Sequence, residues 1–223
     1  MSAEKTLLPW NCKNLWEGCI LVTIAHAISS AHYPEFSYEH SWDGSNYSTQ
    51  DSAGTRGTIT FHKEHCVGAF RDDHSPSLRG KTVDATNYLC GADSKILTLA
   101  QDETFQYLLE DVDGKAVPVI TAAIWGDADT LYALENEQIL FENGLLLLEI
   151  QLMASNEAIK ALTEHYDMDI HQVELLISLH ERFIKNPEQK IKLTLDEINV
   201  IGGDKAGINA SKEVFSEMGI EWV

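Results

Sequence analysis

The chain has 223 residues and a formal net charge of −19, because 35 acidic side chains outnumber 16 basic ones. Hydrophobic residues make up 44% and charged residues 23% of the sequence, which is typical of a folded globular protein and excludes disordered, collagen-like and coiled-coil chains. Nucleic acids and anionic membranes both require a cationic protein surface, so the net charge argues against either as a partner.

The four cysteines are scattered along the chain. Cys12, Cys19, Cys66 and Cys90 form no C-x-x-C pair and match no zinc-site spacing. We interpret all four as reduced, apolar core residues of a cytoplasmic protein. On this interpretation the protein contains no disulfide, no bound metal and no other cofactor.

The apolar run at residues 19–24 is followed by Ala25-His26-Ala27, which has the form of a signal-peptide cleavage site. Acidic residues balance the lysines that precede it, so the positively charged segment of a leader peptide is missing. Apolar residues instead recur at helical spacing, which predicts a buried helix over 15–30. No apolar run approaches the roughly 20 residues of a membrane span.

From residue 36 the pattern becomes that of a β-strand. Phe36, His40 and Trp42 fall on alternate positions with polar residues between them, which predicts a half-buried strand. Asp43-Gly44 then favours a type I′ turn, in which both central residues have positive φ. We expect an antiparallel meander of four strands over about 36–72, with Trp42 mostly buried.

The rest of the chain is predicted to be largely helical. A helix at about 94–110 precedes a strand near 117–125 that joins the first sheet, and further helices are expected within 134–153 and at 156–166, 170–185 and 209–218. Thr194 and Glu197 form a capping box for one more short helix. The fold class is therefore α+β, with an all-helical C-terminal third. We expect a single domain over 1–223, with a possible helical subdomain at 134–223.

A two-residue turn at Lys63-Glu64 would make His62 and His65 direct neighbours on adjacent strands, about 5 Å apart at Cβ. Two imidazoles at that distance could share a metal ion, but no third fixed ligand accompanies them, so no metal site is predicted. The sequence also lacks the nucleophile elbow, the Walker loop and the dinucleotide-binding glycine motif. We therefore assign no catalytic residues and regard enzymatic activity as the less favoured interpretation.

Polar side chains on the meander form a candidate ligand site. Its members share polar character and predicted strand or strand-end positions: His40, Tyr47, Arg56, Arg71 and Asp72. The opposing interpretation is that the tyrosine packs in the core and the arginines pair with nearby acidic residues.

The most uneven feature of the sequence is its charge distribution. Residues 101–149 contain 11 acidic residues and a single basic one, Lys115. Acidic and aromatic residues alternate within this segment, and we predict that the following bind a partner: Trp125, Asp127, Asp129, Tyr132, Glu135, Glu137 and Glu142. The carboxylates would bind lysine and arginine while an aromatic ring anchors the contact. The opposing interpretation is a solvated acidic surface that aids solubility.

These patterns predict a small acidic intracellular protein that inhibits or regulates a basic protein partner. Immunity proteins that neutralise bacterial toxins are one class of this kind, by analogy of charge and size only. The alternative is an enzyme or small-ligand-binding protein with its site on the N-terminal meander. The sequence does not determine the oligomeric state.

Overall fold

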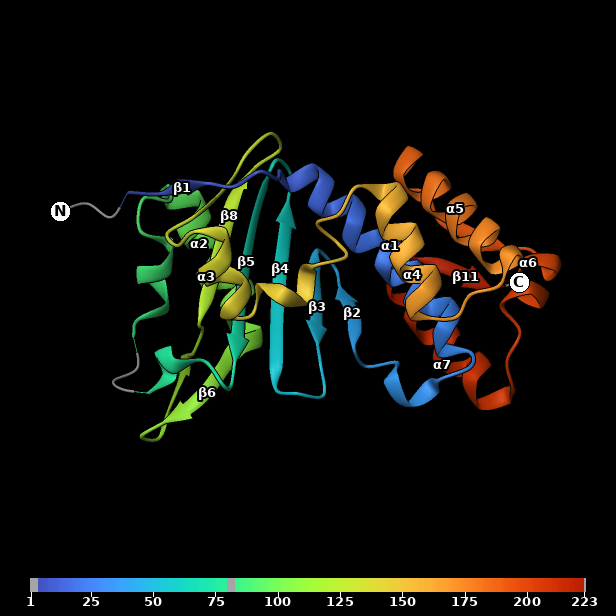
Figure 1. Ribbon diagram of the computed structural model, residues 1–223, viewed down its shortest axis with the longest axis horizontal. Coiled ribbons are helices and arrows are strands. Elements are labelled where there is room, and N and C mark those ends of the chain that lie inside the picture. The colour runs from blue at the N-terminus through green and yellow to red at the C-terminus, as the bar shows by residue number, and fades with distance from the viewer. Residues whose placement is uncertain (1–3, 80–82, 223) are drawn as a thin grey trace. The chain divides into compact units, whose positions relative to one another are not determined.

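The computed structural model describes residues 4–79 and 83–222 (Figure 1). Its contacts divide the chain into two compact units. Unit 1 comprises Met1–Leu15 and Ser45–Glu149, and unit 2 comprises Trp16–Gly44 and Ile150–Val223. The prediction of one domain with a possible helical subdomain at 134–223 stays a prediction. None of the helices in the described part of the chain has both the length and the apolar character needed to cross a bilayer.

Unit 1 is built around an antiparallel sheet. The strands of this sheet that belong to unit 1 lie in the order β1 (Thr6–Leu7), β9 (Leu131–Ala133), β8 (Ala122–Asp127), β5 (His65–Asp72), β4 (Thr55–His62) and β3 (Asn46–Gln50). The middle residues of β4, β5 and β8 are buried in succession rather than alternately, which indicates that both faces of the sheet are covered.

Short helices cover the two faces of this sheet. One face carries Val67, Ala69, Ala123 and Trp125, which form a core with residues of the 3₁₀ helix η3 (Ala85–Leu89), α2 (Ser94–Asp102) and the 3₁₀ helix η4 (Thr104–Leu108). On the other face, the segment joining α3 (Glu137–Glu142) to the 3₁₀ helix η5 (Leu145–Leu148) packs on Phe70. The predicted helix at 94–110 is therefore two shorter elements, α2 and η4.

The strand predicted near 117–125 is also two elements. β7 (Lys115–Pro118) pairs only with β6 (Leu109–Val112) in a small hairpin, whereas β8 joins the large sheet. Pro118 lacks an N–H group and ends the first of these strands. Thr121 then donates its N–H to the Phe70 carbonyl at 2.7 Å, which brings the chain to β5.

The meander prediction is right from residue 40 onward and wrong before it. The segment contains β2 (His40–Asp43), β3, β4 and β5, but Pro34–Phe36 forms the 3₁₀ helix η1, and Tyr38 lies in a turn with 51% of its surface exposed. Proline fixes φ at a value suited to the start of a helix, which outweighs the alternation of apolar residues here.

The turn after β2 lies one residue later than predicted. It consists of Gly44 and Ser45, and only Gly44 has a positive φ, at 60°. This is the pattern of a type II′ turn rather than type I′. Trp42 is buried, as expected, and its Nε1 donates to Thr23 Oγ1 at 2.9 Å.

The prediction that all four cysteines are reduced is wrong. Cys12 and Cys66 form a disulfide that ties the N-terminal segment of unit 1 to strand β5, with their Cα atoms 5.9 Å apart. Cys19 and Cys90 are free thiols. Disulfides persist mainly in oxidising compartments, so the cysteine argument for a cytoplasmic protein no longer holds. Spacing could not reveal this pair, because the fold brings together residues 54 positions apart.

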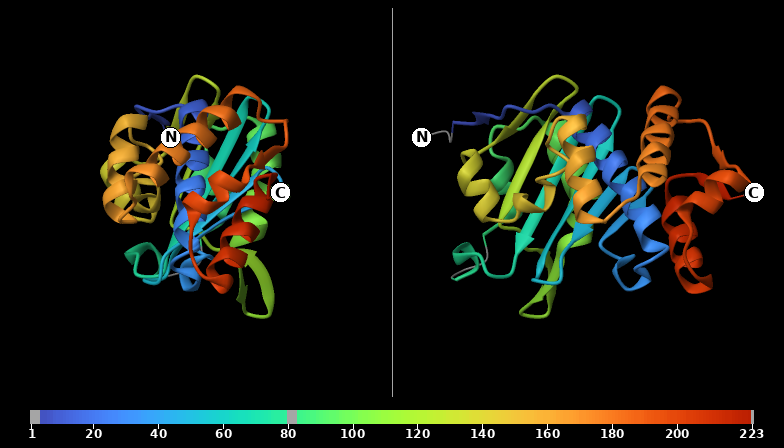
Figure 2. Two further views of the ribbon diagram at one scale, coloured as in Figure 1. Left: turned by 90° about the vertical axis from the view of Figure 1, so that its right-hand side faces the viewer. Right: turned by 45° about the vertical axis from the view of Figure 1, so that its right-hand side comes forward.

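Unit 2 contains most of α1 (Cys12–Ser30), which runs among the helices of the C-terminal third (Figure 2). These helices are α4 (Ser155–His165), α5 (Ile170–Lys185), α6 (Leu195–Ile201) and α7 (Lys205–Glu217). The side of α7 at Gly207 approaches the end of α1 so closely that a Cβ atom there would lie 1.9 Å from the Ala31 carbonyl oxygen.

The C-terminal third is mostly helical, but it is not all-helical as predicted. Strands β10 (Ile191–Leu193) and β11 (Ile220–Trp222) pair in parallel within it. The predicted capping box at Thr194 and Glu197 is present at the start of α6. Asp169 also caps α5, as its position before an apolar run indicates.

Candidate functional site

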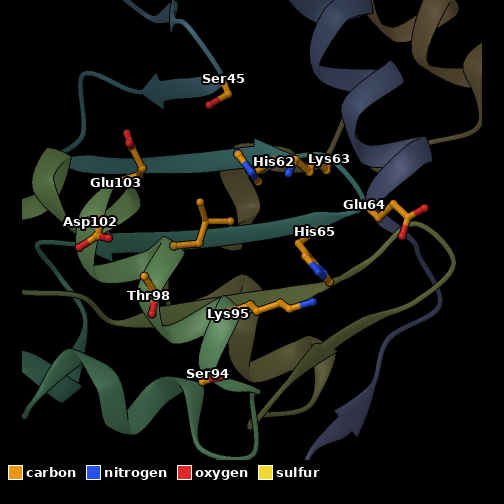
Figure 3. Close-up of a pocket in the computed structure, with 11 residues that line it drawn as sticks. Ser45, His62, Lys63, Glu64, His65, Ser94, Lys95, Thr98, Asp102 and Glu103 are labelled. Atoms are coloured by element: carbon orange, nitrogen blue, oxygen red, sulfur yellow. The ribbon is translucent and has the colours of Figure 1, made fainter.

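A pocket of about 730 Å³ opens on unit 1 where the β4–β5 turn faces α2 (Figure 3). Its walls carry mostly polar and charged side chains: Ser45, His62, Lys63, Glu64, His65, Ser94, Lys95, Thr98, Leu99, Asp102 and Glu103. The volume is within the range of small-molecule sites, although most of its lining residues are exposed.

The β4–β5 turn supplies the first wall. His62 and His65 are direct partners across the two strands, which confirms the predicted two-residue turn at Lys63-Glu64. His65 is also the partner of Asp127 on β8, so His62, His65 and Asp127 form a row across three strands. Within the described residues no group of three or more histidine, cysteine or acidic side chains is arranged to hold a metal ion.

Helix α2 supplies the second wall. Asp93 caps it by accepting hydrogen bonds from the backbone N–H groups of Lys95 and Ile96, both at 2.9 Å. Lys95, Thr98 and Asp102 then follow at helical spacing along the side of α2 that lines the pocket. This wall was not predicted as part of a site, although Asp93 before an apolar periodic segment is a helix-start signal.

Hydrogen bonds fix the acidic end of the pocket. Asn46 Nδ2 donates to Glu103 Oε2 at 3.2 Å, and Asn46 Oδ1 accepts from the Thr60 hydroxyl at 2.6 Å. Thr60 in turn shares a hydrogen bond with Thr104 inside the sheet–helix core. Glu103 is thereby attached to a buried polar network rather than held by solvent alone.

Charges are unevenly placed around the opening. Figure 3 shows Asp102 and Glu103 toward one end, and Lys63, Lys95, the two histidines and also Glu64 toward the other. Glu64 partly offsets the positive charge of the second end, so the pocket is best suited to a small polar molecule whose cationic group meets Asp102 and Glu103.

Two of the five residues of the predicted ligand site are brought together, but with acidic partners. Arg56 and Arg71 are direct partners on β4 and β5. Arg71 lies 2.7 Å from both Asp73 and Glu110, and Arg56 pairs with the same two carboxylates. Two cations and two anions leave no net charge to attract a ligand.

Two other members of that set, Tyr47 and Asp72, point to the opposite face of the sheet from the arginine pair. Tyr47 is fully buried in unit 1, Asp72 accepts a hydrogen bond from the backbone of His74, and His40 belongs to unit 2. Ligand binding by this set stays a prediction, and the contacts of its arginines favour the opposing interpretation.

The predicted acidic surface is exposed at its carboxylates but not at its aromatic rings. Asp127, Asp129, Glu137 and Glu142 are exposed. Trp125 is only 2% exposed and belongs to the core between the sheet and α2, so its ring is not available at the surface.

The other two aromatic residues between positions 125 and 142, Tyr132 and Phe141, already have partners. The Lys5 ammonium lies 3.8 Å from the centre of the half-buried Tyr132 ring, and Phe141 packs against Trp10 at 6.1 Å between ring centroids. Glu135 is half-buried, and the loss of hydration raises the pKa of its carboxyl group. None of the aromatic rings within residues 125–142 is therefore fully exposed as an anchor for a partner.

Two exposed apolar side chains lie close in sequence to the acidic residues of α3 and η5. On α3 and η5, Ile139 is 41% exposed and Leu146 is 58% exposed, and exposed Glu137, Glu142 and Glu149 surround them in the sequence. We use the name α3–η5 face for these five exposed residues, which are grouped by their place in the sequence. Its three carboxylates form no ion pair with any described lysine or arginine.

Comparisons with known proteins identify no relative, so a functional conclusion has to start from the pocket and the surfaces described above. No protein-family model matches the chain, and no significant match was found among curated proteins or solved structures.

Proposed function

We propose that this chain is an acidic binding protein that inhibits or regulates a basic protein partner, and that the α3–η5 face is its contact surface. Neutralisation of a basic toxin, as immunity proteins do, is one function of this kind. The observation that carries the proposal is the combination of exposed Ile139 and Leu146 with three carboxylates that have no cationic partner among the described residues.

The exposed apolar side chains favour a contact surface over an acidic surface that only keeps the protein soluble. Exposed carboxylates alone would keep the protein soluble, and the exposed Ile139 and Leu146 side chains do not serve that purpose. In an interface, apolar side chains at the centre lose contact with water while the surrounding charges steer and orient the partner. A basic protein partner could bury the two apolar side chains and pair its cationic side chains with the three carboxylates.

The test is capture of partners from native host lysate by immobilised protein, with elution by increasing salt. The face variant combines Glu137→Lys with Glu142→Lys. Its matched control combines Glu174→Lys with Glu181→Lys on α5, where both glutamates are also exposed. Both double variants change the net charge equally, so only the position of the new lysines differs.

The proposal predicts a basic protein that is retained at low salt by the wild type and by the α5 control and is lost by the face variant. Leu146→Ser should weaken retention as well, whereas Ile170→Ser, at a residue 64% exposed on α5, should not. Equal retention by the face variant and its control would refute the proposed surface.

A second candidate function is binding of a small polar ligand in the pocket between the β4–β5 turn and α2. The pocket's volume of about 730 Å³ and the separation of Asp102 and Glu103 from Lys63 and Lys95 favour it. Native mass spectrometry of protein purified without denaturation would detect a bound molecule. Lys95→Ala should release it if this function is right, and a wild-type mass equal to that of the bare chain would count against it.

A further inference from the structure

Unit 2 contains a second pocket, of about 320 Å³, between the end of α1 and the end of α4. Side chains from three segments line it, none of them lysine or arginine: His26, Ser29, Ser30, Tyr33, Phe36, Glu39, His165, Tyr166 and Asp167. Its volume is at the lower end of the roughly 300–1,000 Å³ of known ligand sites, which suits one side chain or a small molecule.

Hydrogen bonds around His26 determine which atoms the pocket offers to a ligand. His26 Nε2 lies 3.3 Å from the Ser37 carbonyl oxygen, which can only accept, so Nε2 carries the proton. Burial lowers the pKa of His26 to about 4, so its ring is neutral near pH 7 and Nδ1 is an acceptor. The Tyr166 hydroxyl, 3.2 Å away, therefore donates to Nδ1.

This arrangement leaves acceptors facing the pocket. While the Tyr166 O–H donates to His26, the phenol oxygen retains lone pairs that can accept a hydrogen bond. Glu39 and Asp167 add two carboxylates to the lining, and Glu39 is close enough to contribute to the raised pKa of Tyr166, after the larger effect of burial. A ligand that donates hydrogen bonds and carries positive charge fits this set.

Aromatic rings form the rim. Tyr33 is 47% exposed and Phe36 is 44% exposed, and the His165 ring packs edge-on against Tyr166 at 4.6 Å. Large apolar rings left open to solvent beside a pocket are typical of binding sites. Flat aromatic faces attract cations, and a guanidinium group stacks on them more readily than an ammonium group does.

We propose that this pocket binds the guanidinium group of an arginine side chain presented by the basic partner. The inference deepens the proposed function and depends on it for the source of the arginine. The residues of the pocket are different from those of the α3–η5 face. An experiment can therefore refute the pocket proposal without refuting the proposed contact surface, and the reverse also holds.

The experiment is an NMR titration of the intact protein at pH 7.5 with N-acetyl-arginine amide, followed through the ring signals of Tyr33, Phe36 and Tyr166. N-acetyl-glutamine amide is the uncharged comparison. The pocket variant combines Glu39→Gln with Asp167→Asn, because asparagine tolerates the positive φ of 48° at residue 167. Its matched control combines Glu35→Gln with Glu164→Gln, two exposed neighbours that do not line the pocket.

We expect saturable shifts with the arginine compound and none with the glutamine compound. Loss of both carboxylates should weaken binding about fivefold, which corresponds to roughly 0.5 kcal/mol for each partly exposed charge pair. The control variant should bind within about twofold of the wild type.

Three results would overturn the inference: no saturable shift with the arginine compound, equal shifts with both compounds, or equal weakening in the two double variants. The comparison of compounds on the wild type decides the question even if the pocket variant does not fold. Arginine binding together with an α3–η5 variant that keeps its partner would refute the proposed face and leave this pocket standing.

Discussion

His26 is held in its neutral form inside unit 2. It is 2% exposed, and its ring packs edge-on against His40 at 4.8 Å between centroids. Burial lowers the pKa of His26 to about 4 and places that of His40 well below its usual range, with the neighbouring His165 adding to both effects. The unfolded chain therefore binds more protons than the folded protein between about pH 6.5 and pH 4.

The free energy of unfolding should consequently fall as the pH decreases through that window. For His26 alone, the linkage between protonation and folding gives a loss of about 2 kcal/mol from pH 7 to pH 5. His26→Gln should remove that part of the pH dependence while lowering stability at pH 7. Urea unfolding of both proteins at the two pH values measures the difference, and identical pH dependence would show that His26 is not the titrating group.

Gly44 is a residue whose backbone conformation limits substitution. Its φ is 60°, and a Cβ atom at this position would meet no other atom within 4 Å. The cost of a side chain is therefore backbone strain alone. Gly44→Val should lower the free energy of unfolding by roughly 1–2 kcal/mol, and Gly44→Asn by less, because asparagine tolerates this region. Equal midpoints of thermal unfolding for all three proteins would contradict this account of the turn.

Among the elements, strand β5 is fixed by a covalent bond as well as by pairing. Cys12 and Cys66 are both buried, and their disulfide closes a loop between residues 54 positions apart. Constraint of the unfolded chain by such a loop stabilises the folded state by about 4 kcal/mol in the chain-entropy model.

Cys12→Ala with Cys66→Ala should therefore lower the free energy of unfolding by about 4 kcal/mol, measured in urea without reductant. Cys90→Ala is the control, because Cys90 is an exposed free thiol. Thiol titration of the denatured, unreduced wild type should detect only Cys19 and Cys90. Detection of all four thiols before reduction would mean that the disulfide does not form.

Elements defined by local signals could be predicted from the sequence, whereas those defined by distant contacts could not. The caps at Asp169 and Thr194 and the tight turn between His62 and His65 depend on neighbouring residues only. The 3₁₀ helix at Pro34–Phe36 shows the limit, because one proline outweighs an alternating pattern.

In the candidate sites, too, features that depend on neighbouring residues were predictable and features that depend on distant contacts were not. The histidine pair at the β4–β5 turn was predictable, but the α2 wall of its pocket depends on how a helix packs on the sheet. The pocket around Tyr166 joins residues more than a hundred positions apart, and no spacing rule would connect His26 with Tyr166. Burial of Trp125 likewise depends on α2, which the alternation of acidic and aromatic residues does not reveal.

For the molecule as a whole, charge is the main guide to a partner. A net charge of −19 produces a field that attracts cationic proteins and repels nucleic acids. Steering by such a field acts mainly on the association rate and weakens as salt screens it. The proposed function therefore predicts that the association rate constant depends on the position of the acidic residues. Two variants with the same net charge should differ in this rate.

The most direct test is the association rate constant of the captured basic partner, measured by stopped flow over a range of salt concentrations. Glu137→Lys with Glu142→Lys should slow association by about tenfold or more at low salt and flatten its salt dependence. Glu174→Lys with Glu181→Lys, which changes the net charge equally on α5, should remain close to the wild type. If both double variants slow association to the same extent, total charge alone attracts the partner and the α3–η5 face is not its binding surface.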